Sequence, residues 1–474
     1  MQSEELLELI NQIQQRKTES QTTELKSAEK GCPTKLFDTL SAFSNQDSGG
    51  IIVFGIDEDR DFNVCGVYDA QDLQKRINEQ CKQMEPCIRP LFTVCDIDGK
   101  VVVSAEIPGI DPADRPVFYK GVGRIKGSYI RSGDADEQMN EYEIYSYFAY
   151  RKRIHDDLRV AENMINPLLN EDRINDYLKA VKEERQNLAQ SVSDKDILEF
   201  MGVKVEGRPT LAGLMTFSKY PQAFYPQLCI TAVSVAGTAM GDTGDDGERF
   251  IDSKRITGAI PDMLDEAMAF VKKNMRTQVI INDEGKRTDK PEYPLKAVRE
   301  AVLNALIHRD YSVHTENTPV RIEMYRDRME IINSGGLYGR ISVSELGKSR
   351  PETRNTYLAN MLEMLKVTEN RYSGIPTICK EFEEAGLPLP IFSVSHGEFK
   401  IIMKNSYVGG GHHDADSLVE FCRIPRTRAE LIAFTGFSRT YTMIQLVQPL
   451  VEKGVLKLTI PEKPKSSKQK YVKA

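Results

Sequence analysis

The segment 295–310, LKAVREAVLNALIHRD, predicts a helix that is apolar on nearly all sides. Its apolar residues recur at helical spacing, namely Val298, Val302, Leu303, Ala305, Leu306 and Ile307. A helix of this kind must be buried against other elements. The next segment, 319–336, alternates as a β-hairpin does, with Val320, Ile322 and Met324 on one face. The two patterns together predict a helix packed on a sheet, and therefore an α/β domain.

Three polar residues interrupt the apolar surface of this helix. Glu300, Asn304 and His308 follow one another at intervals of four, so they form a single stripe. A carboxylate one turn from an amide can hold hydrated Mg²⁺ and orient a water molecule at a phosphate. The alternative is a helix that simply turns this stripe toward solvent.

The stripe stands within a longer match. EAVLNALIHRDY, the hairpin and NSGGLYG resemble the GHKL-type ATPase module, in the variant fused at the C-terminus of regulators related to a recombination helicase. The resemblance spans 255–405 and includes SRPETRN (349–355), YSGIPTI (372–378) and AGLPLPIF (385–392). It implies ATP and Mg²⁺ as cofactors, with Glu300 polarising the attacking water and Asn304 as the metal ligand. It also implies a nucleotide-contacting set of Asn304, His308, Asn333, Gly335, Gly336 and Gly374.

Two positions depart from that module. Asn333 stands where the first glycine box has an aspartate, and Ser373-Gly374-Ile375-Pro376 replaces glycines two apart. An amide lacks the charge of a carboxylate, and proline removes a backbone donor. These changes favour nucleotide binding over hydrolysis. GKS at 347–349 is no Walker loop, because position 342 is Ser and no apolar strand precedes it.

The N-terminal part alternates short helical and strand patterns. TESQTTELKSA, SAFSNQDSGGIIVFGIDED and GSYIRSG occur in the order found in the Schlafen-type AlbA domain, which this chain resembles over 15–140. The resemblance implies nucleic-acid binding. We expect a last strand at 124–133 with its basic residues outward, and phosphate or base contacts from Lys26, Arg124, Lys126, Tyr129 and Arg131.

Some members of the Schlafen family cleave RNA with three carboxylates. Glu19 and Glu24 have the matching spacing of five, and Asp57 follows the apolar strand 51–57. Three acids could assemble a divalent-metal site. They converge only if the chain changes conformation between 19 and 24, since a spacing of five separates two side chains on a helix or a strand. The alternative is that Glu24 pairs with a lysine and Glu19 caps a helix.

The C-terminal part, 414–474, has the pattern helix, turn, helix and hairpin, which is typical of a winged helix. Its second helix follows the turn at Phe437-Ser438 and predicts groove contacts from Arg439, Thr440, Thr442 and Gln445. Seven lysines lie between Lys453 and Lys473, and of these Lys468 and Lys470 predict a wing that contacts phosphates. A solvated basic tail would explain the lysines equally well.

Composition sets the remaining expectations. The net charge of −7 requires any nucleic-acid contact to come from local patches. The eight cysteines include no CxxC pair, the N-terminus lacks a secretory pattern, and no run of about 18 apolar residues could span a membrane. We therefore expect a cytoplasmic protein with free thiols and no membrane partner, and possible pairing of winged helices suggests a homodimer.

The expected organisation is a multidomain α/β (α+β) chain. Its predicted parts are an AlbA-like domain at 1–150, a helical connector with a small α/β segment at 151–250, a GHKL-like two-layer sandwich at 251–408, and the winged helix at 414–474. Within 211–237 we expect a strand, a turn and a second strand. This organisation favours a DNA-binding transcriptional regulator of the bacterial type, with RNA as another possible target. The alternatives are a metal-dependent nuclease, an ATPase, or a scaffold with a decayed ATP site.

Overall fold

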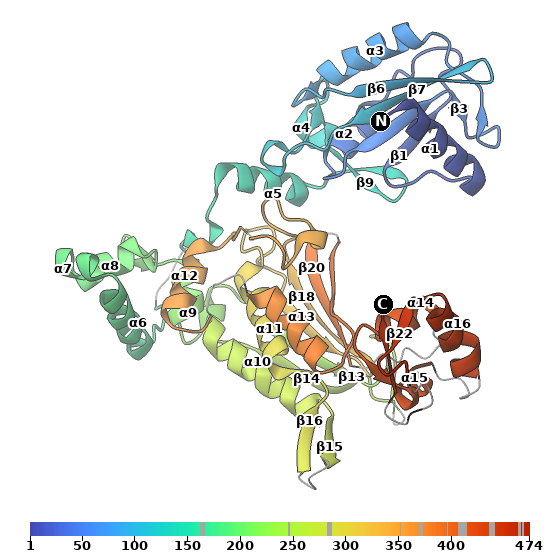
Figure 1. The fold of residues 1–474 in the computed structure, drawn as a ribbon. Coiled ribbons are helices and arrows are strands. Elements are labelled where there is room, and N and C mark those ends of the chain that lie inside the picture. Colours follow the sequence, from blue (N-terminus) through green and yellow to red (C-terminus); the bar gives the residue numbers. More distant parts are fainter. Residues whose placement is uncertain are drawn as a thin grey trace. The chain divides into compact units, whose positions relative to one another are not determined.

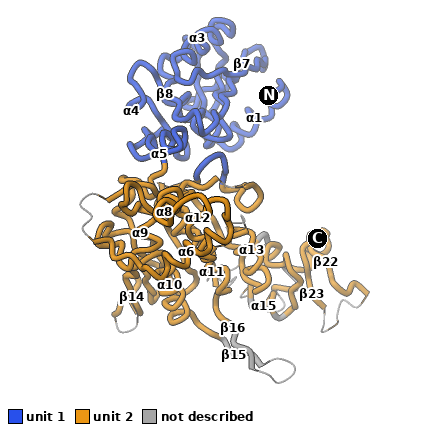
Figure 2. The backbone as a smooth tube through the Cα atoms, turned by 90° about the vertical axis from the view of Figure 1, so that its left-hand side faces the viewer, with its two compact units in different colours: residues 1–154, 338–342 blue, residues 155–337, 343–474 orange. Residues whose placement is uncertain are grey.

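The computed structural model describes residues 1–161, 166–244, 247–281, 287–350, 352–368, 373–395, 397–405, 415–435, 441–462, 466 and 469–474. Of these, residues 278–281, 287–290, 415, 416, 429, 433, 441, 444 and 445 are described by their backbone alone. The chain forms two compact units, 1–154 with 338–342 and 155–337 with 343–474, here called the N-terminal unit and the second unit (Figure 2). Among the helices described, none has both the length and the apolar composition needed to cross a bilayer.

The N-terminal unit is built on a four-stranded sheet in the order β1-β2-β7-β6 (Figure 1). Its strands are β1 (Thr23–Lys26), β2 (Gly50–Phe54), β6 (Leu91–Ile97) and β7 (Lys100–Ile107). β1 pairs with β2 in parallel, and the other neighbours are antiparallel. The turn between β6 and β7 uses Asp98 and Gly99 at φ of 51° and 78°, which is the backbone that an Asp-Gly hairpin turn requires.

Helices cover both faces of this sheet because alternate residues of a strand point to opposite sides. Ile52 and Phe54 of β2 share a core with α2 (Phe37–Ser44) and α3 (Ala70–Lys82). Val53 instead packs with α1 (Ser3–Arg16), which contributes Leu6, Ile10 and Ile13.

The other elements of this unit are β3 (Ile56–Asp57), β4 (Asn63–Val64), β5 (Met84–Glu85), η1 (Pro112–Asp114), β8 (Phe118–Tyr119), α4 (Gly123–Gly127), β9 (Tyr129–Ser132), β10 (Ala135–Gln138) and α5 (Glu141–Lys152).

The predicted strand at 124–133 is wrong in its first half, where α4 forms. The Ser128 hydroxyl donates to the Arg124 carbonyl (2.6 Å) and closes that helical turn, so the strand begins only at Tyr129.

Residues 338–342 belong to the N-terminal unit, although the chain on both sides of them belongs to the second unit. The Tyr338 ring meets the Tyr150 ring edge to face, with 5.1 Å between centroids. Arg340 Nε lies 2.7 Å from Asp111 Oδ2.

The second unit contains a six-stranded sheet in the order β14-β13-β17-β18-β20-β19. The strands are β13 (Ile230–Val235), β14 (Phe250–Ile256), β17 (Val320–Met324), β18 (Arg328–Ser334), β19 (Ile391–Ser395) and β20 (Glu398–Lys404). β13 and β17 are parallel, and the remaining pairs are antiparallel. The alternation predicted for the hairpin is confirmed, since Val320, Ile322 and Met324 are buried together.

One face of this sheet is covered by α10 (Ile260–Asn274), α11 (Leu295–His308) and α13 (Gly374–Glu384) (Figure 1). Charged side chains pair on the other face, with Arg321 on Glu398 (2.7 Å) and Lys400 on Glu330 (2.9 Å). A sheet with one covered face and one charged face forms a two-layer sandwich with the helices.

The rest of the second unit before residue 415 comprises η2 (Asp156–Leu158), α6 (Glu171–Glu184), α7 (Gln186–Ser191), α8 (Asp194–Phe200), β11 (Lys204–Val205), β12 (Arg208–Pro209), α9 (Leu211–Phe217), η3 (Pro221–Ala223), β15 (Thr277–Ile281), β16 (Arg287–Pro291), η4 (Val343–Glu345) and α12 (Thr356–Met364).

The strand predicted at the start of 211–237 is wrong, because the helix α9 forms there. Thr210 accepts the Gly213 N–H (3.0 Å) as an N-cap, and all seven residues of α9 are buried, so the sequence carries no helical polar face.

The C-terminal segment, residues 415–474, contains α14 (Ala415–Phe421), β21 (Arg426–Thr427), α15 (Arg428–Thr435), the π-helical turn η5 (Tyr441–Val447), α16 (Gln448–Glu452), β22 (Leu456–Leu458) and β23 (Lys470–Lys473). The strands pair in the order β21-β23-β22. Its own core includes Leu418, Phe434, Val447 and Tyr471.

Candidate nucleotide and nucleic-acid sites

The polar stripe of α11 lies beside the first turn of α13. Glu300 and Asn304 are half-buried, and His308 is exposed, whereas most of the remaining residues of α11 are in the core. Gly374 begins α13, and a Cβ placed on it would lie 2.8 Å from Asn304 Nδ2. Only a glycine therefore leaves the Asn304 amide its present position. The structure brings Asn304 and Gly374 together, as a shared site requires.

A second glycine lies at the end of β18. Gly335 has φ of +100°, and its N–H donates to the Gly397 carbonyl (2.7 Å). A Cβ at this position would be 2.5 Å from Arg354 Nη1 and 2.9 Å from the Asp310 backbone nitrogen. The turn needs glycine both for its backbone conformation and for this close approach.

A buried ion pair supports that turn. Arg354 Nη1 lies 2.8 Å from Asp310 Oδ2, with 8% and 3% of the two side chains exposed. Arg354 Nη2 also donates to the Gly336 carbonyl at 3.4 Å. The neighbouring Asn355 donates from Nδ2 to the carbonyls of Ile307 (2.7 Å) and Arg309 (2.8 Å), which fixes the C-terminal end of α11.

The segment containing Arg354 also reaches the stripe. Thr353 Oγ1 lies 3.5 Å from His308 Nδ1. Desolvation by the surrounding protein, together with the Arg354 charge, lowers the pKa of His308 to about 4. The ring is then neutral near pH 7 and can serve as a hydrogen-bond partner.

Two other residues expected at this site have neighbouring partners of their own. Asn333 is buried within β18, where its Nδ2 donates to the Ser334 carbonyl (3.2 Å). Glu300 lies 3.8 Å from Arg299 Nη1. Asp310 and Arg354 were missed by the sequence analysis, because the sequence alone does not show which of His308, Arg309 and Asp310 are buried.

The donor set suits a magnesium nucleotide. Mg²⁺ keeps several waters and takes one or two protein oxygens together with phosphate oxygens. The Glu300 carboxylate and the Asn304 amide are such oxygens, one helical turn apart, and the α13 N-terminus offers backbone N–H groups to a phosphate. No group of three or more His, Cys, Asp or Glu that could hold a metal occurs in the part of the chain that the structure describes.

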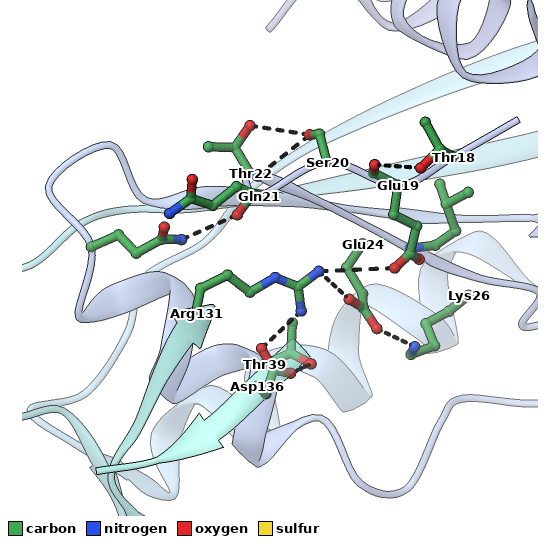
Figure 3. Close-up of polar contacts among 12 residues, drawn as sticks. Thr18, Glu19, Ser20, Gln21, Thr22, Glu24, Lys26, Thr39, Arg131 and Asp136 are labelled. Atoms are coloured by element: carbon green, nitrogen blue, oxygen red, sulfur yellow. Dashed lines mark hydrogen bonds and ion pairs between the residues drawn. The ribbon is translucent and has the colours of Figure 1, made fainter. Parts of the chain in front are cut away.

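Two of the three carboxylates expected in the N-terminal unit, Glu19 and Glu24, lie around Arg131 together with Asp136 (Figure 3). Arg131 Nη2 lies 2.9 Å from Glu24 Oε2 and 3.8 Å from Glu19 Oε2, and Nη1 lies 2.8 Å from Asp136 Oδ1. Only 1% of the Arg131 side chain is exposed. The expectation that Arg131 contacts phosphate is therefore wrong, because β9 turns this side chain into the protein.

The two glutamates have further partners. The Leu25 N–H donates to Glu19 Oε1 (2.7 Å), and Lys26 pairs with Glu24 (Figure 3). Burial raises the pKa of Glu19, and the nearby Glu24 charge acts in the same direction. Asp57, the third expected carboxylate, pairs with Arg60, whose Nε lies 3.2 Å from Asp57 Oδ2.

The remaining basic residues of this unit lie on or beside α4. Lys126 is exposed, and Arg124 lies half-buried over the Phe118 ring at 5.3 Å. The Tyr129 hydroxyl bonds to Asp38, so this ring is held in place. Val122 and Ile125 add exposed apolar surface beside these cations.

In the C-terminal segment the residues predicted to contact DNA lie in different environments. Thr442 is fully buried, and its hydroxyl shares a 2.6 Å hydrogen bond with Thr435, so it faces the core and no groove. Lys470 is exposed on β23. Arg439, Thr440 and Lys468 lie outside the described residues, as does the side chain of Gln445.

Comparisons with known proteins match two parts of the chain. A family model described as "Schlafen, AlbA_2" matches residues 19–140, and one described as "Putative ATP-dependent DNA helicase recG C-terminal" matches residues 317–403. The second match begins after α11, so Glu300, Asn304 and His308 precede it. No curated protein matches the chain.

Two solved structures are similar to the chain. The DIP2311 protein from Corynebacterium diphtheriae is 15% identical, with a TM-score of 0.40 over 90% of this chain and 87% of that chain. The N-terminal domain of the "Putative ATP-dependent DNA Helicase RecG-related Protein" from Nitrosomonas europaea is 23% identical, with a TM-score of 0.23 over 28% of this chain and 92% of that chain. On its family matches and its mixed α/β fold, the chain combines a Schlafen-type AlbA domain with an ATPase-like domain of the helicase-related C-terminal type.

Proposed function

We propose that this protein is a DNA-binding transcriptional regulator whose ATPase-like domain binds ATP with Mg²⁺. One observation carries the nucleotide part of the proposal. Asn304 of α11 meets the Gly374 start of α13, while the Gly335-Gly336 turn is held by a segment that also reaches His308. In the proposed site, backbone N–H groups, an amide and a carboxylate would together supply the contacts that a phosphate chain with Mg²⁺ needs.

Within this site each residue has a chemical role. Asn304 would ligate Mg²⁺ through its amide oxygen, and Glu300 would orient a water molecule near the terminal phosphate. When bound, the magnesium nucleotide supplies the phosphoryl group and the charge that organises the site. We propose slow or absent hydrolysis, because Asn333 is buried with its amide on the Ser334 carbonyl and carries no charge.

The DNA part rests on the two ends of the chain. The C-terminal segment has the order helix, strand, helix, helix, strand, strand, with the first strand beside the last, and this supports a winged helix. Lys470 and Lys457 are exposed on its strands. In the N-terminal unit, Lys126 and Arg124 accompany exposed apolar side chains on α4, a combination that suits a nucleic-acid backbone.

Cleavage of RNA by Glu19, Glu24 and Asp57 has no such support. A divalent cation needs several free carboxylate oxygens, and the Arg131 guanidinium already lies among those of Glu19 and Glu24. Labelled RNA should therefore stay intact with Mn²⁺ or Mg²⁺, both for the wild type and for E24Q.

The direct test of the whole proposal is footprinting of the full chain on genomic fragments, with and without Mg-ATP. Protection of discrete sites that changes with ATP supports the proposal. Weak binding along the whole fragment that is the same with and without ATP would instead support a scaffold protein with a decayed ATP site. Light scattering of the same sample gives the oligomeric state, where we propose a homodimer.

A further inference from the structure

The buried pair of Asp310 and Arg354 lies next to the proposed phosphate site. Burying two charges removes both from water, and such a pair is often no more stabilising than apolar residues of the same size. A buried ion pair that adds little stability can instead act as a switch, with one charged group exchanging its partner. With 3% and 8% of their side chains exposed, Asp310 and Arg354 fit this description.

Arg354 contacts the glycine turn formed by Gly335 and Gly336. Its Nη2 donates to the Gly336 carbonyl (3.4 Å), and any side chain at Gly335 would collide with its Nη1. The turn is the part of the proposed site that a nucleotide would approach, and the Arg354 guanidinium is in direct contact with it.

Arg354 also lies beside the polar stripe. The residue before it, Thr353, has its hydroxyl 3.5 Å from His308 Nδ1, and the Arg354 charge acts on that imidazole. The cation is therefore close to both borders of the site, the glycine turn and the end of α11.

We propose that Arg354 binds the terminal phosphates of the nucleotide and that Asp310 holds the guanidinium when these phosphates are absent. This inference rests on the proposed nucleotide site. A guanidinium matches phosphate oxygens with two parallel N–H donors, and a lysine ammonium does not. Asp310 keeps a partner after the exchange, because its Oδ1 accepts the Ser312 N–H (2.7 Å). The site would then distinguish nucleotides by the number of their phosphates.

The test compares affinities for adenosine, ADP and ATP, each with Mg²⁺, by calorimetry on the full chain. R354K should weaken ATP binding about 10–100-fold, the effect of losing a hydrogen bond to a charged group, and leave adenosine binding within about twofold. R173K is the matched control, since Arg173 forms an ion pair with Asp262 (2.6 Å) in the same unit but outside the site. It should leave all three affinities unchanged.

A second variant separates phosphate binding from a structural role. D310N keeps an acceptor for the Ser312 N–H but releases the guanidinium, so ATP should bind as tightly as in the wild type or more tightly. Equal losses for adenosine and ATP in R354K, or a loss of ATP binding in D310N as large as in R354K, would show that the pair only holds the turn and would overturn the inference. A wild type that binds adenosine and ATP equally overturns it too, while a wild type that binds neither contradicts the proposed function itself.

Discussion

Arg131 Nη2 and Glu24 Oε2 lie 2.9 Å apart inside the N-terminal unit, with 1% and 10% of their side chains exposed. The same guanidinium pairs with Asp136, whose other oxygen accepts the Thr39 hydroxyl (2.6 Å). One buried arginine thus joins β1, β10 and α2. It stabilises the domain from within, and the nucleic-acid surface that we propose would be made by other cations.

Removing this arginine should destabilise the N-terminal unit strongly. R131M would remove the guanidinium from the buried Glu24 and the half-buried Asp136, and breaking buried pairs of this kind costs about 3–5 kcal/mol. Urea denaturation followed by circular dichroism measures the change. R60M is the matched control, because the Arg60 side chain is 58% exposed and its loss should cost less than about 1 kcal/mol. Equal effects of the two variants would contradict a buried ionic core.

Gly374 should matter for nucleotide binding more than for folding. In G374A the new methyl group would push the Asn304 amide from its present position, since their separation would be only 2.8 Å. Alanine is otherwise favourable in a helix, so the free energy of unfolding should change by less than about 1 kcal/mol. ATP affinity should fall about 2–10-fold, the effect of one neutral hydrogen bond. G241A, in open space, should leave that affinity unchanged.

Asp157 should give the second unit a pH-dependent stability. Its Oδ2 accepts the N–H groups of Tyr357 (3.0 Å) and Leu358 (3.1 Å) at the start of α12, and burial raises its pKa above the usual 3.8. An acid with a raised folded pKa favours the folded state when protonated. Its contribution is therefore largest below pH 3.8 and is lost as pH rises through the raised value.

The variant D157N isolates this effect, because asparagine can still accept both N–H groups. The wild type should lose stability relative to D157N as pH rises from about 3.5, as measured by urea denaturation. The same series in an H155Q background removes the nearby His155, whose Nδ1 lies 3.9 Å from Asp157 Oδ1. A stability difference that stays constant with pH would contradict the raised pKa.

Lys126 should contribute to nucleic-acid binding through phosphate contact. K126Q should weaken binding of duplex DNA for any sequence and reduce the slope of log K against log salt by about 1. K179Q, on the exposed side of α6, removes the same charge elsewhere and should change neither quantity. An unchanged slope in K126Q would exclude α4 from the interface.

Periodic patterns allowed much of the fold to be predicted. The helix α11 and the hairpin β17–β18 follow from spacing that a single element determines, and β2 overlaps the apolar strand predicted at 51–57. α9 could not be predicted, because burial on all sides removed the polar face that marks a helix. The prediction that Thr442 contacts DNA was wrong for a related reason. The sequence does not distinguish a threonine that hydrogen-bonds to Thr435 in the core from a threonine exposed to a DNA groove.

The site was predictable only where it lies on one element. Glu300, Asn304 and His308 share α11, so their spacing was informative. Asp310 and Arg354 are 44 positions apart in the sequence, and Arg131 and Glu24 are more than 100 positions apart. Such pairs are formed by tertiary packing, so no local pattern in the sequence indicates them. The direction of Arg131 was decided by which face of β9 the fold buries.

The central claim is that α11, α13 and the glycine turn bind a magnesium nucleotide. Calorimetric titration of the full chain with Mg-ATP, with N304A and the control N274A in parallel, tests it most directly. Asn274 is a half-buried asparagine of α10 that bonds Asp252 (2.9 Å) away from the site. Saturable binding by the wild type and N274A, weakened at least about tenfold in N304A, is the predicted result. No binding by the wild type, or equal binding by N304A, would contradict the account.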